Sequence, residues 1–546
     1  MVGESRKWVI LLASIWVQAF TGTNFDFSSY SSELKSVLDI TQLQLNYLSV
    51  ASDMGKAFGW CSGVSLMYFP LWVVMFMAAF MGLFGYGFQW LVIHRLITLP
   101  YVVLKVETLT TTQYPMVLEA LLYCSGKYTA VSRCSALQCH GRPQCICWFN
   151  TICYVLCIRH FPANRSLALS LSISFNGVSA ALYTLIANAI NTNDDTVYLL
   201  LNAIVPVLIS GLVLIPILNQ PQPQPHSVDT IQRDTSVFLC LNILALVTGL
   251  YLLFLYSFSY TMAIARVILI GAIFLLVLLL FLPGIVYSRE WSFFTVPTSF
   301  SFYYSRFTRA DPNDDELYKE FISIEDSVRN RSAQSTREKK CCIMNVLERE
   351  QFSMLGEEHS AKLLVRKWDF WLYYIAYFCG GTIGLVYSNN LGQISQSLGH
   401  YSQTSSLVTL YSTCSFFGRL LAASPDFLSR KIHIARTGWF GAGLVLTPIA
   451  FILLAISGSG AALHIGTALI GLSSGFVFSA AVSITSELFG PNSVGVNHNI
   501  LITNIPLGSC LYGLLAALEV LPTNFHMVEL YFNDRIGFKL LPFHKD

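Results

Sequence analysis

Two charged residues, Asp53 and Lys56, stand three positions apart inside a long apolar stretch of the chain. That spacing is about one helical turn, so the carboxylate and the ammonium group can meet as an ion pair. An ionisable group in apolar surroundings is costly and commonly faces a cavity or a partner. The pair is therefore either structural or part of a conformational or proton-coupling device. Gly55, Gly59 and Gly63 recur every four residues beside it and predict a smooth face for close helix packing.

Amide and acidic side chains in other apolar stretches form a second set of candidates. A buried amide needs a hydrogen-bond partner, which either a neighbouring helix or a polar solute in a central cavity can supply. The substrate-binding candidates are Asn24, Asp26, Asn150, Asn176, Asn389 and Asn390.

A charged motif in the second half of the chain could control conformation. Gly418-Arg419-Leu420 is followed by Pro425-Asp426 and then by Arg430-Lys431. The glycine lets two helices approach closely, and an acid among bases on a tight loop can form ion pairs in one state and release them in another. The competing interpretation is a solvated basic loop. The conformational or coupling candidates are Asp53, Lys56, Gly418, Arg419, Asp426, Arg430 and Lys431.

Enzymatic and cofactor chemistry finds little support in the residue pattern. The glycines Gly82, Gly85 and Gly87 are not accompanied by the lysine and serine that a phosphate loop requires. The missing residues argue against ATP-driven transport. Four residues have the spacing of zinc ligands but lie in or beside an atypical stretch: Cys134, Cys139, His140 and Cys145. We therefore expect that the protein is not an enzyme and that it binds no metal and no cofactor.

The elements that carry these residues are apolar segments long enough to cross a membrane. The chain has 546 residues, of which 54% are hydrophobic and 12% charged, against about 25% charged in ordinary soluble domains. A spanning helix needs roughly 20 apolar residues. The predicted spans are 8–27, 45–66, 69–93, 166–190, 197–218, 237–258, 262–286, 368–387, 405–423, 438–456, 461–484 and 499–518. A thirteenth must be assembled from 99–104 and 145–158, so we predict an all-α polytopic protein with about 12–13 transmembrane helices.

Basic residues indicate how these spans are oriented. With the N-terminus in the cytoplasm, the inside segments carry 21 Lys and Arg residues, while the short outside segments carry only Lys35. Cytoplasmic loops are enriched in Lys and Arg, so the count favours a cytoplasmic N-terminus. The first span then remains as a signal anchor rather than a cleaved signal peptide. The net charge of +2 offers no case for a nucleic-acid partner.

The spans divide the chain into two bundles with an insert between them. We predict a six-helix bundle over 1–218, a two-helix insert over 219–287, a cytoplasmic loop over 288–367 and a second bundle over 368–518. A polar stretch, 105–144, interrupts the fourth span, either as a retained non-coding segment or as a real loop. Residues 519–546 form an atypical tail with scattered apolar residues.

Several motifs resemble one protein family. Gly418 to Lys431 is similar to the cytoplasmic signature loop of the major facilitator superfamily. More specific matches are Gly85-Tyr86-Gly87-Phe88-Gln89-Trp90-Leu91, Cys147-Trp148-Phe149-Asn150-Thr151 and the run from Phe161 to Gly177. These resemble plant nodulin-like proteins of the nuclear fusion defective 4-like group, over about 6–104 and 145–518. The resemblance implies a major-facilitator-type, two-bundle architecture. Members of that family have a continuous fourth helix, whereas residues 105–144 interrupt the fourth span here. Members also end in a further spanning helix, whereas this chain has the atypical tail 519–546 at that place.

The leading functional hypothesis is a membrane transporter that moves a small solute by alternating access. Facilitated and proton-coupled movement both remain open, as do the solute or ion, the membrane and the oligomeric state. The partners would be that solute and the lipid bilayer. The alternative is a non-transporting membrane sensor or a defective paralogue of a transporter, motivated by the interrupted fourth span and the atypical tail.

Overall fold

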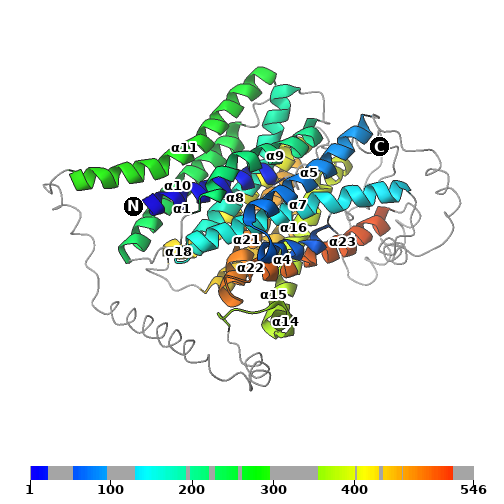
Figure 1. Ribbon diagram of the computed structural model, residues 1–546. Helices are drawn as coiled ribbons and strands as arrows, with labels where there is room; N and C mark the ends of the chain where they lie inside the picture. Colours follow the sequence, from blue (N-terminus) through cyan, green and yellow to red (C-terminus); the bar gives the residue numbers. More distant parts are fainter. Residues whose placement is uncertain are drawn as a thin grey trace.

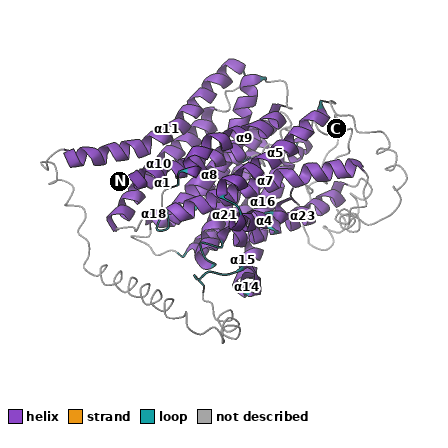
Figure 2. Cartoon of the chain, viewed as in Figure 1, coloured by secondary structure: helices purple, strands orange, loops and turns teal. Residues whose placement is uncertain are grey.

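The structure is a computed structural model, and it describes residues 2–22, 53, 55–94, 130–191, 197–220, 228–255, 261–295, 355–399, 403–428, 435–457 and 459–520. Every regular element in these ranges is helical (Figure 2). Seven of the described helical segments are long and apolar enough to cross a membrane: Arg165–Ile190, Val197–Leu218, Arg233–Leu255, Met262–Leu279, Trp368–Gly392, Arg436–Ile456 and Gly460–Leu488. Leu71–Gly87 and Cys145–His160 are shorter apolar helices. The predicted all-α, multi-pass membrane fold is confirmed.

The first half of the chain forms one group of packed helices, here called the N-terminal group. Its members are α1 (Val2–Thr21), η2 (Gly55–Phe58), α4 (Trp60–Tyr68), α5 (Leu71–Ile93), α7 (Ala130–His160), α8 (Arg165–Ile190) and α9 (Val197–Leu218). Helix α8 lies inside the molecule, and 94% of its most apolar window is buried. Small residues and serines dominate its sequence, because a helix surrounded by other helices must let them approach.

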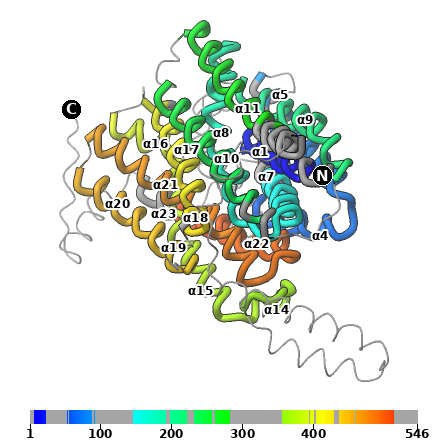
Figure 3. Tube along the Cα trace, turned by 90° about the vertical axis from the view of Figure 1, so that its left-hand side faces the viewer, coloured from blue at the N-terminus to red at the C-terminus, as the bar shows by residue number. Residues whose placement is uncertain are grey.

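The last part of the chain forms the C-terminal group. It contains α14 (Ala361–Arg366), α15 (Trp368–Tyr377), η6 (Phe378–Thr382), α16 (Ile383–Ser397), α17 (Thr404–Leu421), α18 (Ser424–Leu428), α19 (Arg436–Leu444), α20 (Leu446–Ile456), α21 (Gly460–Leu488), α22 (Val494–Ile502) and α23 (Asn504–Val520). The two groups lie side by side, with α8 and α17 at their border (Figures 1 and 3).

Helices α10 (Val228–Leu255) and α11 (Met262–Thr295) pack together beside the N-terminal group. A buried ion pair fixes α10 against the first helix: Lys7 Nζ lies 2.6 Å from Asp234 Oδ2. Trp8, Phe161 and Phe238 surround this pair with ring centroids about 5 Å apart. Lys7 also lies over the Trp8 and Phe161 rings, at 5.8 and 5.7 Å from their centroids, so the charge is held by both an acid and aromatic faces.

A short π-helical turn interrupts the first long helix of the C-terminal group. Residues Phe378–Thr382 widen the helix between α15 and α16, at the sequence Phe-Cys-Gly-Gly-Thr. Such turns frequently occur at functional sites, because they rotate the helix beyond them. The Thr382 hydroxyl donates to Asn504 Oδ1 over 3.1 Å and ties the turn to α23.

Candidate solute cavity between the two helix groups

The predicted pair of Asp53 and Lys56 is buried and formed. Lys56 Nζ lies 2.6 Å from Asp53 Oδ1, with 5% of each side chain exposed. The other carboxylate oxygen accepts hydrogen bonds from the C-terminal group, from Asn389 Nδ2 at 3.2 Å and from the Ser509 hydroxyl. The carboxylate therefore joins an element of the N-terminal group to both α16 and α23.

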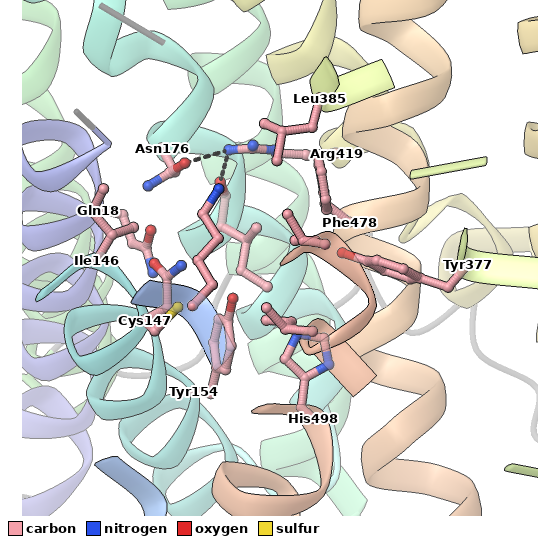
Figure 4. Close-up of a pocket in the computed structure, with 15 residues that line it drawn as sticks. Gln18, Ile146, Cys147, Tyr154, Asn176, Tyr377, Leu385, Arg419, Phe478 and His498 are labelled. Carbon is pink, nitrogen blue, oxygen red and sulfur yellow. Dashed lines mark hydrogen bonds between the residues drawn. The ribbon is translucent and has the colours of Figure 1, made fainter. Parts of the chain in front are cut away.

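A cavity of about 70 Å³ lies beside this pair and is lined by helices of both groups (Figure 4). Elements η2, α1, α7 and α8 supply one wall, and α15, α16, α17, α21, α22 and α23 supply the other. The volume is well below the roughly 300–1,000 Å³ of most ligand pockets. Its polar lining residues are Gln18, Lys56, Asn150, Asn176, Arg419 and His498.

Arg419 crosses the border between the groups at the cavity wall. The side chain projects from α17, and its Nη1 donates to the Ile173 carbonyl and to Asn176 Oδ1 on α8, both over 3.0 Å. Only 3% of the residue is exposed. The Arg419 carbonyl in turn accepts from the Ser170 hydroxyl. Two elements far apart in sequence are thus connected at one buried cation.

Several polar atoms at the cavity have no hydrogen-bond partner among the described residues. They include Gln18 Oε1 and Nε2, Asn150 Oδ1, Asn176 Nδ2 and His498 Nδ1. Asn176 and His498 are 7% and 2% exposed, so bulk water does not reach them. Because an unpaired buried polar group costs free energy, these atoms are suited to a solute or to water held in the cavity.

Aromatic and aliphatic side chains complete the cavity wall. Tyr154 and Tyr377 face it from opposite groups (Figure 4). The Tyr154 and His498 rings meet edge to face, with centroids 5.5 Å apart. Tyr377 immediately precedes the π-helical turn. The remaining lining side chains are Ile146, Cys147, Ile173, Leu385, Phe478, Ile502 and Ile505.

The two groups meet closely at the end of the molecule where α4 ends and α8 begins, here called the loop end. A Cβ atom added at Gly63 would lie 2.6 Å from the Gly495 backbone, so α4 and α22 pack with almost no side chain between them. The Asn499 amide donates to Thr151 Oγ1 at 2.8 Å. The Ser166 and Ser483 hydroxyls bond at 3.1 Å. These contacts join the two groups, and α22 is the neighbour of the predicted glycine face.

A second charge network lies at the loop end. Arg436, at the start of α19, contacts Asp426 of α18 and the Ser166 hydroxyl of α8. Its Nε lies 2.6 Å from Glu487 Oε1 on α21. Burial raises the pKa of the Asp426 carboxyl, and the Arg436 guanidinium opposes that rise. One cation therefore holds two acids and also reaches the N-terminal group.

Some of the residues that the sequence predicted for the site line the cavity, and others lie elsewhere. Lys56, Asn150, Asn176 and Arg419 line the cavity, although Lys56 and Arg419 were proposed for coupling rather than for substrate binding. Asn389 contacts Asp53 instead.

The other predicted residues lie away from the cavity or outside the description. The Asn390 side-chain amide donates a hydrogen bond to the Val386 carbonyl of its own helix over 2.9 Å. Gly418 packs against the α21 backbone at Leu472 and Phe476. Asn24, Asp26, Arg430 and Lys431 lie outside the described residues.

Sequence reasoning missed Tyr154, Tyr377, His498 and Arg436. The first three stand in apolar stretches, where aromatic residues and a lone histidine have the pattern of ordinary core. In the sequence, nothing distinguishes Arg436 from the other basic residues of the predicted cytoplasmic loops. Its spacing of ten residues from Asp426 carries no helical signal, so only the folded loop brings the two together.

Comparison with known proteins supports a single family for the whole chain. The Nodulin-like family matches residues 7–116 and 127–287, so the interruption in that match is 117–126. The NFD4 C-terminal domain matches residues 351–526. Protein NUCLEAR FUSION DEFECTIVE 4 of Arabidopsis thaliana is 52% identical over 519 residues, which cover 95% of this chain and 81% of that protein.

Two solved structures are similar at low identity. A bacterial homologue of the human lysosomal transporter Spinster, in an inward-facing and unoccupied conformation, matches with a TM-score of 0.43 and 9% identity, over 94% of this chain and 83% of that one. Tetrameric PepTSo2 matches with a TM-score of 0.33 and 9% identity, over 95% and 98%. Neither likeness carries weight here. The family is carried by the sequence matches: this chain belongs to the nodulin-like proteins that combine a Nodulin-like domain with an NFD4 C-terminal domain.

Proposed function

We propose that this membrane protein moves a small solute by alternating access, with the solute held in the cavity between the two helix groups and no use of ATP. The single observation that carries the proposal is the cavity itself, which has a polar lining contributed by both groups. A site shared by two bundles can be exposed to either side by rocking one bundle against the other. The proposal also includes a cytoplasmic N-terminus, which puts the loop end in the cytoplasm.

Contacts between the groups support a state closed toward the loop end. Gly63 against Gly495, Ser166 against Ser483 and the Arg436 network all lie there. These contacts are small or electrostatic, so they can separate without exposing a large apolar surface. We propose that opening the loop end breaks them, and that the links from Asp53 to Asn389 and Ser509 loosen or re-form in the same movement.

Reconstitution tests transport directly. The full chain is placed in liposomes that contain no ATP, and uptake is followed for anionic, cationic and neutral small solutes under an imposed solute or proton gradient. Protein-dependent uptake of at least one class is expected. Uptake equal to that of protein-free vesicles across the whole panel would contradict the proposal and favour a non-transporting membrane protein.

A reversible cross-link tests whether the loop end must open. In the double variant S166C/S483C, oxidation would join α8 to α21, where the native hydroxyls are 3.1 Å apart. Oxidation should abolish uptake and a reductant should restore it. The matched control is T447C/S473C, which joins α20 to α21 within one group, where the hydroxyls are 2.7 Å apart. Oxidising the control should leave uptake unchanged, as should the same treatment of the native protein.

A further inference from the structure

We propose that the cavity takes a small neutral polyol, whose hydroxyl groups bond with the neutral polar side chains of the lining. The inference rests on the proposed function, because it names the class of solute for the same site. Three features of the cavity carry it. Its cations have partners within the protein, its neutral polar atoms include both donors and acceptors, and the rest of its wall is apolar.

The two cations of the described lining, Lys56 and Arg419, are already held by the protein. Lys56 Nζ lies 2.6 Å from the Asp53 carboxylate. Arg419 donates to the oxygens of Ile173 and Asn176 and makes further interactions within the protein. Because both cations have partners, the cavity does not need a counter-ion, and a charged solute would lose its hydration there without an ionic partner in return. A neutral solute is therefore favoured.

Neutral side chains supply the polar atoms that have no hydrogen-bond partner among the described residues. Asn150 Oδ1 is an acceptor, Asn176 Nδ2 is a donor, and His498 Nδ1 takes either role according to its tautomer. Asn176 and His498 are both more than nine-tenths buried. The hydroxyls of Tyr154 and Tyr377 point toward the same space from opposite groups (Figure 4), and a phenol both donates and accepts. The solute must therefore combine donors with acceptors.

Hydroxyl groups meet this requirement, whereas ionic groups and ethers do not. A carboxylate and an ether only accept and an ammonium only donates, but a hydroxyl does both and rotates to suit its partners. One hydroxyl is not enough, because the unpartnered atoms of Asn150, Asn176 and His498 lie on α7, α8 and α22. A solute with several hydroxyls can bond to both helix groups at once, and it would satisfy buried polar atoms that otherwise need water.

The rest of the wall suits the carbon atoms of a polyol. Ile173, Leu385 and Ile502 offer apolar surface, and the rings of Tyr154 and Tyr377 can cover C–H groups. One water molecule needs roughly 10–15 Å³ of cavity space, so a cavity of about 70 Å³ has room for about five to seven non-hydrogen atoms. Glycerol is a polyol of that size.

Equilibrium binding of radiolabelled glycerol to the purified full chain in nanodiscs tests the inference, with the protein prepared without glycerol. Saturable binding that unlabelled glycerol displaces is expected, and nanodiscs without protein should show none. The competitors are lactate, diaminopropanol and dimethoxyethane, which have as many non-hydrogen atoms as glycerol. Lactate is an anion, diaminopropanol is a cation, and dimethoxyethane has acceptors but no donors. Each should therefore compete about tenfold more weakly than glycerol, or less.

The competition has clear contrary outcomes. Lactate or diaminopropanol competing as well as glycerol would overturn the assignment of a neutral solute. Equal competition by dimethoxyethane would overturn the need for donors on the solute. Absence of saturable glycerol binding would overturn the inference as a whole.

Variants of His498 connect the binding to the lining. H498F keeps an aromatic ring against Tyr154 but removes both ring nitrogens, so glycerol binding should weaken by about 5- to 20-fold. H498N ends in an amide that offers a donor and an acceptor, so it should recover part of the affinity. The matched control is H464F, which should bind as the native chain does. His464 contacts the Gly460 carbonyl of its own helix and lies outside the described lining.

A variant on the other helix group gives a second readout should H498F fail to fold. N150L replaces the unpartnered amide oxygen of α7 by an apolar group, and a loss of affinity similar to that of H498F is expected. The matched control is N242L, because the Asn242 amide donates to the Phe238 carbonyl of its own helix, α10. Native affinity in H498F and N150L alike would overturn the site.

The binding and liposome experiments fail independently. Uptake of a charged solute without glycerol binding would overturn this inference and leave transport standing. Glycerol binding that depends on His498, without movement of any solute across the bilayer, would leave the polyol site standing and contradict transport.

Discussion

Arg419 Nη1 donates to Asn176 Oδ1 over 3.0 Å and so joins α17 of the C-terminal group to α8 of the N-terminal group. Ring packing of Phe175 against Phe416 lies at the same border, with centroids 5.5 Å apart. At this point the border therefore combines aromatic packing with a hydrogen-bonded cation at the edge of the cavity. Since the bond connects the two groups, any rocking movement must either carry it along or break it.

The first prediction concerns this bond. In N176L the guanidinium loses the Asn176 oxygen as an acceptor, and the loss of a hydrogen bond to a charged group costs about 1.5–3 kcal/mol. We expect a lower melting temperature in detergent and a looser border in hydrogen exchange of α8. N390L is the control, because among the described residues the Asn390 amide bonds within its own helix, to the Val386 carbonyl. Equal melting temperatures for the two variants would show that the bond contributes nothing to stability.

The second prediction concerns how α10 docks on α1. In K7M the Asp234 carboxylate loses the ammonium group that now lies 2.6 Å away. Leaving a buried acid without its cation costs about 3–5 kcal/mol, so thermal unfolding should begin at a clearly lower temperature. The double variant K7M/D234N removes both charges and should recover a large part of the loss. If the single and double variants unfold alike, the pair is not what holds α10.

The third prediction concerns Arg436. Replacing it in R436Q leaves Asp426 and Glu487 close together without their shared cation, at a cost of about 1–3 kcal/mol. The pKa of Asp426, already raised by burial, should rise further without the guanidinium. A carboxyl with a raised pKa contributes stability that is lost as pH increases. The melting temperature of R436Q should therefore fall, relative to the native chain, from mildly acidic to neutral pH.

Double substitution separates charge from packing at this network. R436Q/E487Q removes the cation together with one of its acids, so its relative stability should depend less on pH than that of R436Q. A pH dependence identical in both variants would contradict the role assigned to the Arg436 network.

The fourth prediction concerns Glu358, which caps the start of α22. Its carboxylate accepts from the backbone N–H groups of Asn492 and Ser493, at 2.7 and 3.2 Å, and from the Ser493 hydroxyl at 2.9 Å. E358A should cost about 1 kcal/mol and speed hydrogen exchange in the first turn of α22. The matched control is E357A, since the Glu357 side chain is also exposed but contributes only its backbone carbonyl to the described bonds. Unchanged exchange in E358A would show that the cap is not formed in solution.

The sequence was sufficient for the long apolar helices and for four of the fifteen residues that line the cavity. Long apolar segments must be membrane helices because the bilayer leaves backbone groups no other partner, so the membrane fold follows from composition and length. Lys56, Asn150 and Asn176 were found because polar groups inside apolar segments are rare, whereas Arg419 was found through the charged motif that begins at Gly418. Their assembly into one cavity depends on which helices neighbour each other, which a single sequence does not encode in any local pattern.

The remaining site residues could not be recognised without the fold. Tyr154, Tyr377 and His498 are indistinguishable from core residues until the cavity shows which way they face. Ser509 looks like a minor helix residue, yet its hydroxyl contacts Asp53 across 456 positions of sequence. Contacts between residues so far apart arise from tertiary packing alone.

The central claim, that the two helix groups rock about the cavity, is tested most directly by a distance between them at the loop end. Spin labels carried by non-canonical amino acids replace Ala163, in the turn before α8, and Thr437, in α19, both of which are exposed. Pulsed electron resonance in nanodiscs should give two distance populations, and oxidised S166C/S483C should retain only the shorter one. A single narrow distribution, unchanged by the cross-link, would contradict alternating access.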